Sequence, residues 1–127
     1  MKKYHSIPYA TGGRSFAGAD CYGLVILYFR EELGIQLADY TYENTKDVGS
    51  RNMLLGNCDA EFIEVPLKDA IKNDLVFFEL PDYGIAHCGV MVNDRNVMQI
   101  TEHHGCTITK LSRYGNVHSI HRHKELC

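Results

Sequence analysis

A cysteine at the start of an apolar segment is the residue of this chain best suited to chemistry. Cys21 follows Asp20 and opens the segment 21–33, CYGLVILYFREEL, which is rich in good helix formers and stops before Gly34. This pattern predicts a helix over 21–33 with Asp20 as its N-cap. Unpaired backbone N–H groups and the positive end of the helix dipole favour a thiolate in the first turn. We therefore predict that Cys21 is a nucleophile.

A histidine and a glutamine in the second half of the chain are the candidates for the base and its orienting partner. The apolar runs 74–79 and 88–92 are separated by turn residues and predict two strands, with His87 at the mouth of the second. A further turn leads into a third predicted strand, 97–101, and antiparallel pairing would bring Gln99 within reach of the His87 ring. A thiol, an imidazole and a polar orienter are the parts of acyl transfer by a cysteine.

Two other histidines compete with Gln99 for the orienting role. His103 and His104 lie just beyond the third predicted strand, at a turn marked by Gly105. We favour Gln99 because it lies within the strand that is expected to pair with the strand of His87. His103 and His104 stay as alternatives.

These motifs resemble those of the NlpC/P60 family of papain-like cell-wall cysteine peptidases. The family places a tyrosine and a Gly-Gly pair before a D-C-x-G nucleophile motif on a helix. A D-L-V-F-F strand and an H-x-G strand follow, and a third polar residue comes twelve residues after the histidine, as Gln99 follows His87 here. The corresponding residues, over roughly residues 4–122, are Tyr9, Gly12-Gly13, Asp20-Cys21-Tyr22-Gly23-Leu24-Val25, Asp74-Leu75-Val76-Phe77-Phe78, His87-Cys88-Gly89-Val90 and Gln99.

The resemblance also implies roles for single residues. The hydroxyl of Tyr9 would join the backbone N–H of Cys21 in polarising the scissile carbonyl. Asp20 would meet a substrate amine in addition to capping the helix. Tyr22 stands where the family more often has serine, and we group it with the residues expected to contact substrate. The catalytic residues would be Cys21, His87 and Gln99.

Length, composition and charge indicate one domain without a nucleic-acid or membrane partner. The 127 residues are 45% hydrophobic and no linker, repeat or low-complexity tract divides them, so we expect a single NlpC/P60-type domain over residues 1–127. A net charge of −3 gives no basic surface for nucleic acid or acidic lipid. Apolar runs of the ~18 residues that cross a bilayer are missing from the sequence, so we expect no membrane insertion.

The N-terminus and the cysteines bear on the compartment. Five cysteines, an odd number, do not predict a disulfide framework, and a catalytic thiol must stay reduced. Lys2-Lys3 is followed by Tyr4-His5-Ser6 where a signal peptide would be apolar, so we expect synthesis in the cytoplasm without a signal peptide. The segments 20–23 (DCYG) and 30–35 (REELGI) resemble the phage-encoded branch of the family. We therefore expect the chain in the virion, with phage tail-tip proteins as partners.

No cofactor or metal is expected for a thiol–imidazole enzyme. The competing candidate for a metal site is a histidine-rich C-terminal region together with nearby turn residues, because imidazoles and thiols are common zinc ligands. Its spacing matches no closed zinc pattern, and such a cluster is more often a solvated edge. The residues concerned are His118, His121, His123, Cys127, His103, His104 and Cys106.

The expected fold is α+β and, by the resemblance, papain-like. N-terminal helices carrying Cys21 would pack on an antiparallel sheet of about five strands carrying His87 and Gln99. The segment 36–70 would add one short helix and loops over the substrate groove. The strands are expected at 74–79, 87–93, 96–101, 105–111 and 116–122.

The resemblance implies hydrolysis of an amide bond in the stem peptides of peptidoglycan, by a phage tail-tip component that opens the cell wall locally. Two alternatives stay open. One is a structural tail-tip subunit that retains the catalytic residues in an occluded groove. The other is an amidase or acyltransferase of the same fold that acts on another amide or on a lipid.

Overall fold

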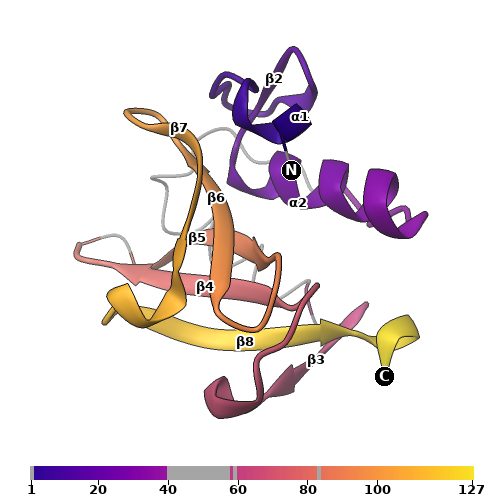
Figure 1. Ribbon diagram of the computed structural model, residues 1–127, viewed down its shortest axis with the longest axis vertical. Coiled ribbons are helices and arrows are strands. Elements are labelled where there is room, and N and C mark those ends of the chain that lie inside the picture. Colours follow the sequence, from indigo (N-terminus) through magenta and orange to yellow (C-terminus); the bar gives the residue numbers. More distant parts are fainter. Residues whose placement is uncertain (1, 40–57, 59, 83) are drawn as a thin grey trace.

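An antiparallel sheet of six strands forms one side of the protein, and a buried helix lies against it (Figure 1). The computed structural model describes residues 2–39, 58, 60–82 and 84–127. Each neighbouring pair of strands in the sheet is antiparallel. In spatial order the strands are β3 (Phe62–Val65), β8 (Val117–His123), β4 (Leu75–Leu80), β5 (Gly84–Met91), β6 (Asn96–Thr101) and β7 (Gly105–Lys110).

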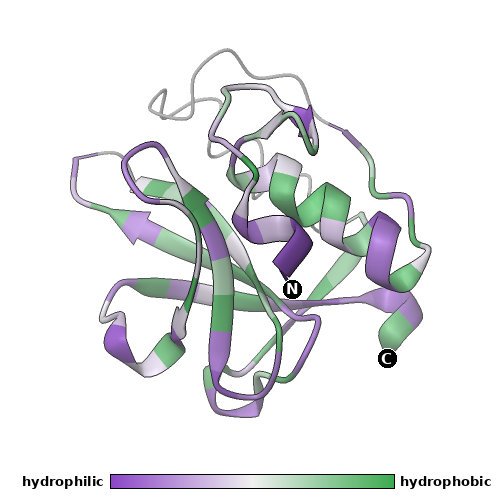
Figure 2. Ribbon diagram, turned by 45° about the horizontal axis from the view of Figure 1, so that its top comes forward, coloured by the Kyte–Doolittle hydropathy of each residue, from purple (hydrophilic) through white to green (hydrophobic). Residues whose placement is uncertain are grey.

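Helix α2 (Cys21–Tyr28) is buried along its whole length. Its sequence, CYGLVILY, carries no charge on any side, so the helix must be enclosed all round, and Figure 2 shows it in mostly hydrophobic colours. The chain continues as a π-helical turn, η1 (Phe29–Leu33), and stops at Gly34, whose φ of 65° is left-handed. The predicted helix over 21–33 is thus present, but its second half has the wider π geometry.

Residues of β4 alternate between two hydrophobic cores, one on each face of the sheet. Leu75 and Phe77 belong to the core that includes α2, whereas Val76 and Phe78 belong to the core on the opposite face. This arrangement explains why the run is apolar at every position. The same alternation on β5 directs Cys88 toward α2, and places the neighbouring His87 beside Phe78.

A small hairpin precedes α2 and leads the chain into it. The hairpin consists of β1 (Arg14–Ser15) and β2 (Gly18–Ala19), and a short helix, α1 (Lys2–His5), comes before it. The backbone of Tyr9 forms a parallel bridge with Ala19, so the N-terminal segment lies alongside β2, which ends directly before Asp20. The other described helical elements are the 3-10 turns η2 (Leu67–Asp69), η3 (Leu111–Arg113) and η4 (Lys124–Leu126).

The expected α+β architecture is confirmed, and each of the five expected strands is present with ends displaced by at most three residues. The sequence pattern does not predict β3, because this short edge strand exposes Ile63 and Glu64 and lacks a regular alternation. In the segment 36–70 the structure places β3 and η2, while residues 40–57 and 59 lie outside the described residues. No helix in the described part of the chain is long and apolar enough to cross a membrane.

Candidate active site

The carboxylate of Asp20 caps the helix that begins with Cys21. One oxygen accepts hydrogen bonds from the backbone N–H of Gly23 at 2.8 Å and from Nη1 of Arg14 at 2.7 Å. The other oxygen accepts from the backbone N–H of Gly12 at 2.8 Å. Asp20 is completely buried, and an ionised carboxylate there would be strongly destabilising without such partners. The predicted N-cap is confirmed, and it also ties the Gly-Gly turn to the helix.

Two glycines permit this close approach of the turn to the helix. A Cβ on Gly23 would overlap the carbonyl oxygen of Gly13, and a Cβ on Gly13 would overlap the carbonyl oxygen of Gly18. A larger residue at either position would separate the turn from α2. The glycines of the sequence motif therefore serve to bring donors to Asp20.

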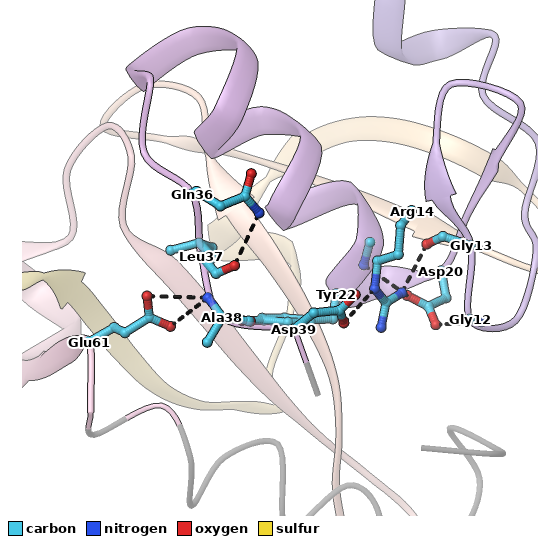
Figure 3. A network of polar contacts seen from close by, with 11 residues as sticks. Gly12, Gly13, Arg14, Asp20, Tyr22, Gln36, Leu37, Ala38, Asp39 and Glu61 are labelled. Carbon is cyan, nitrogen blue, oxygen red and sulfur yellow. Dashed lines mark hydrogen bonds and ion pairs between the residues drawn. The ribbon is translucent and has the colours of Figure 1, made fainter. Parts of the chain in front are cut away.

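Arg14 connects the start of α2 to the segment 37–39 (Figure 3). Its Nε donates to the carboxylate of Asp39 at 2.9 Å, and its guanidinium lies over the ring of Tyr22, 5.8 Å from the centroid. The hydroxyl of Tyr22 donates to the carbonyl oxygen of Ala38 at 2.6 Å. Tyr22 and Asp20 thus make contacts within the protein itself, and their expected contacts with substrate stay predictions.

Two side chains act on the pKa of the Cys21 thiol, the thiol of Cys88 and the imidazole of His87. The hydrogen bond with Cys88 lowers the pKa of Cys21 most, and the hydrogen bond and charge of His87 lower this pKa further. Burial of the thiol and the charge of Asp20 act in the opposite direction and raise it. The pKa of Cys21 falls from its ordinary 9.0 to about 5, whereas the contact with Cys21 and burial raise the pKa of Cys88. These shifts favour the thiolate at Cys21 and the protonated thiol at Cys88.

The pKa of His87 is shifted in the direction that completes an ion pair. Burial disfavours its imidazolium, but the hydrogen bond and charge of Cys21 and the hydrogen bond with Gln99 outweigh burial and raise the pKa of His87. The opposite shifts of the two pKa values favour a thiolate at Cys21 and an imidazolium at His87. An imidazolium beside a thiolate is the arrangement from which a cysteine attacks and its base returns a proton.

Gln99 is hydrogen-bonded to the imidazole, within the reach that the strand pairing predicts. Oε1 of Gln99 lies 2.7 Å from Nε2 of His87, and Nε2 of Gln99 donates to the hydroxyl of Tyr114 at 2.6 Å. A carbonyl oxygen only accepts, so Nε2 of His87 carries a proton and Nδ1 is the nitrogen left for Cys21. Gly89 permits this contact, because a Cβ there would lie 2.7 Å from the carbonyl oxygen of Met98 and 3.2 Å from Cβ of Gln99.

The structure places Tyr9 close to the start of α2 in the chain, and His103 and His104 at an exposed turn. Tyr9 is half-buried, packs against the core that contains α2, and pairs through its backbone with Ala19, two residues before Cys21. His103 and His104 are exposed at the turn between β6 and β7. Because the hydrogen bond to His87 belongs to Gln99, the geometry favours Gln99 over these two histidines for the orienting role.

Sequence reasoning missed three residues that support the site. Arg14 pairs with Asp20, Tyr114 binds Gln99, and Cys88 meets the nucleophile. The alternation of β5 already directs Cys88 into the core below α2, which is a signal that Cys21 and Cys88 share that core. No pattern in the sequence links Tyr114 to Gln99, since they lie on different elements 15 residues apart.

The histidine-rich region is engaged in contacts of β8. The hydroxyl of Ser119 lies 2.8 Å from Nδ1 of His118 and 2.8 Å from Nε2 of His121, and the ring of His123 packs edge-on against Phe62 with centroids 5.1 Å apart. Among the residues that the structure describes, no three His, Cys, Asp or Glu side chains are grouped so that they could hold a metal ion.

Solved structures with this fold include cell-wall enzymes. The NlpC/p60 domain of the peptidoglycan hydrolase SagA matches with a TM-score of 0.67 and 17% identity over 94% of this chain and 89% of its own. An NlpC/P60 family protein from Bacillus cereus matches with a TM-score of 0.69 and 20% identity over 95% of this chain and 37% of its own. The peptidoglycan hydrolase RipB from Mycobacterium tuberculosis matches with a TM-score of 0.63 and 20% identity over 95% of this chain and 59% of its own. At these identities the likeness establishes the fold, and the chain spans only part of the last two proteins.

A family model, rather than any single curated protein, identifies the relatives of this chain. No curated protein matches it significantly. The model of the NlpC/P60 family matches residues 6–124, which include each of the residues assigned to the site above. This protein therefore belongs to the NlpC/P60 family.

Proposed function

We propose that this protein is a cysteine peptidase that hydrolyses an amide bond in the stem peptides of peptidoglycan. The observation that carries the proposal is the hydrogen bond of 2.7 Å between His87 and Gln99, together with Cys21 in the first turn of α2, where His87 helps to lower the pKa of its thiol. A lowered pKa of Cys21 and a raised pKa of His87 supply a nucleophile and a proton donor in the same site. The choice of substrate is supported by the family, whose solved members include the peptidoglycan hydrolases SagA and RipB.

The proposed reaction has two steps. The thiolate of Cys21 attacks the amide carbonyl carbon and forms a C–S bond, and the oxyanion is held by the backbone N–H of Cys21 and the hydroxyl of Tyr9. His87 then gives its proton to the amide nitrogen, the C–N bond breaks and the amine leaves. In the second step His87 takes a proton from water, whose oxygen attacks the thioester, and the carboxylic acid leaves as the thiolate of Cys21 returns. Gln99 keeps Nδ1 of His87 directed at Cys21 throughout.

The test is incubation of the purified chain with isolated peptidoglycan, followed by mass spectrometry of the released fragments. We expect new amine termini at a single bond of the stem peptide, and none with Cys21→Ala. Cys106→Ala is the matched control, because Cys106 is a buried cysteine on β7 whose pKa burial raises to about 11. Equal release by the Cys21→Ala variant, or no release by the unaltered chain, would contradict the proposal.

One observation favours the second candidate, a structural subunit with an occluded site. Cys21 exposes only 3% of its surface, so a substrate carbonyl must gain access to a thiol that lies below the surface. The two candidates differ in their reaction with iodoacetamide at pH 7. In an accessible peptidase, iodoacetamide alkylates Cys21 before the other four cysteines. In an occluded site Cys21 stays unmodified while the exposed Cys127 reacts.

We further propose that a phage tail carries the chain to the cell wall, where tail-tip proteins hold it. The support is the likeness of residues 20–23 and 30–35 to the phage-encoded branch of the family. Mass spectrometry of purified particles from the source organism tests this proposal. Particles without this chain would contradict it and would leave the proposed chemistry untouched.

A further inference from the structure

A closed ring of contacts surrounds the imidazole of His87. On its polar side, His87 bonds Gln99 at 2.7 Å and Gln99 bonds the hydroxyl of Tyr114 at 2.6 Å. On its apolar side, the ring of Tyr114 meets the ring of Phe78 edge-on with centroids 5.4 Å apart, and the ring of Phe78 lies 5.5 Å from the imidazole. Tyr114 therefore lies opposite His87 in this ring of contacts and, like His87, touches both Gln99 and Phe78.

We propose that Tyr114 is a positioning residue for His87 and acts chiefly by fixing the amide of Gln99. The inference rests on the proposed function, because it takes His87 to be the base of the peptidase. Tyr114 does not touch the reacting atoms in this arrangement. It determines how firmly the carbonyl oxygen of Gln99 is held against Nε2 of His87.

The chemistry of a glutamine side chain explains why a second anchor is needed. A primary amide can turn end for end and present either its carbonyl oxygen or its N–H₂ group to the imidazole. Only the carbonyl oxygen can accept a hydrogen bond from the N–H that Nε2 carries when His87 is an imidazolium. The hydroxyl of Tyr114 binds the amide nitrogen of Gln99, and the same hydrogen bond polarises the carbonyl toward the ring.

The position of Tyr114 is itself fixed by the backbone. Its N–H donates to the carbonyl oxygen of Leu111 at 3.0 Å, and the N–H of Leu111 donates to the carbonyl oxygen of Arg95 at 2.8 Å. Tyr114 also lines a hollow of about 340 Å³ whose other walls are mostly neutral and polar. The other lining residues are Gln99, Thr101, His104, Thr107 and Thr109.

The decisive variant is Tyr114→Phe, which removes the hydroxyl and keeps the ring on Phe78. We expect kcat to fall about fivefold, the factor that one ordinary hydrogen bond supplies, with KM unchanged. We also expect the imidazole of His87, followed by NMR, to titrate at a lower pH than in the unaltered chain. Tyr28→Phe is the matched control, because it removes a tyrosine hydroxyl that donates to Asn73 at 2.7 Å and is not part of the ring of contacts around His87. This control should leave kcat and the titration of His87 unchanged.

A second comparison separates positioning through Gln99 from a merely structural role. In a Gln99→Ala background, Tyr114→Phe should change neither kcat nor the titration of His87 any further. An unchanged titration in the Tyr114→Phe single variant, or an equal additional loss in the Gln99→Ala background, would overturn the proposal. The NMR titration needs no substrate, so a chain that fails to cut peptidoglycan would refute the proposed function and still test this one. Melting curves of each variant confirm that it folds.

Discussion

The two halves of the site, nucleophile and base, are supported in different ways. The carboxylate below Cys21 is held by Gly12, Arg14 and Gly23, which lie within nine residues of it in the chain, through backbone N–H groups and an ion pair. Apart from Cys21, the partners of the His87 imidazole described above are neutral groups on separate elements. A buried charge requires donors and a counter-charge, whereas a base requires mainly a fixed orientation and a defined tautomer. The comparison predicts that variants near Asp20 affect stability and charge, while variants near His87 affect turnover.

The largest effect should come from removing either reacting group. Cys21→Ser keeps the shape of the first helical turn but supplies a far poorer nucleophile, so we expect hydrolysis to fall by about three orders of magnitude or more. His87→Ala should be equally damaging, and neither change should alter the fold. Release of muropeptides per unit time is the measurement. If either variant retained more than about a tenth of the activity, Cys21 and His87 would matter no more for turnover than the residues that position them, and their assignment as the reacting pair would be contradicted.

On the base side, Gly89→Ala should disturb the contact between His87 and Gln99. The added methyl would lie 2.7 Å from the carbonyl oxygen of Met98, which is backbone and must move. We expect turnover to fall about tenfold and the free energy of unfolding to fall by about 1–3 kcal/mol. Gly115→Ala is the control, since nothing lies within 4 Å of a Cβ there. Equal effects of the two substitutions would show that strand spacing near Gln99 does not govern the base.

On the nucleophile side, Arg14→Met should act mainly on stability. It leaves the fully buried Asp20 without its ion pair, and we expect a loss of about 2–3 kcal/mol in the free energy of unfolding, moderated because the Arg14 side chain is 20% exposed. Arg14→Lys, which keeps the charge, should lose less. Asp20→Asn combined with Arg14→Met should recover part of the loss, measured by urea unfolding. A double variant no more stable than the single one would indicate that packing rather than charge is lost.

The pH dependence of alkylation should report the contact between the two cysteines. Because the pKa of Cys21 is lowered to about 5, its rate of reaction with iodoacetamide should rise through that pH rather than near 9.0, where free thiols ionise. Cys88 donates to the thiolate and so favours it. Cys88→Ala should therefore move the midpoint to higher pH, whereas Cys106→Ala should leave it in place. An unmoved midpoint in Cys88→Ala would assign the shift to His87 alone.

The smallest expected effect is that of metal removal. Neither the thiolate nor the imidazolium needs a cation, so dialysis against EDTA should leave hydrolysis unchanged. A drop in the melting temperature after dialysis would instead point to a structural metal in the histidine-rich region. Loss of hydrolysis that returns with added zinc would contradict the metal-independent mechanism.

The contrast between the two halves also explains how far the sequence alone leads. Cys21 with its cap is visible because the hydrogen bonds that Asp20 accepts from Gly12, Arg14 and Gly23 are local, and local spacing is what a sequence displays directly. The contact between His87 and Gln99 follows from pairing of adjacent strands, which a hairpin pattern predicts.

Other features depend on tertiary packing. Tyr114 reaches Gln99 from a turn beyond β7, and β3 is too short and too exposed to give a periodic signal. The π-helical geometry of 29–33 likewise follows from how that segment is enclosed rather than from its residue types. The unpredicted parts of the site are those whose partners lie far apart along the chain.

The spread of these contacts along the chain has a consequence for folding. The hydrogen bonds that Asp20 accepts from Gly12, Arg14 and Gly23 span at most eight residues, whereas the ring of contacts around His87 joins Phe78 to Tyr114. Closing a longer loop costs more chain entropy, so we expect the cap of α2 to form early and the base to be fixed only when β8 joins β4. A growing chain that has reached Gln99 holds every residue of the expected triad but lacks the strand that completes the sheet. We therefore expect the thiol to be activated only late in folding, so that a partly folded chain carries no reactive thiolate.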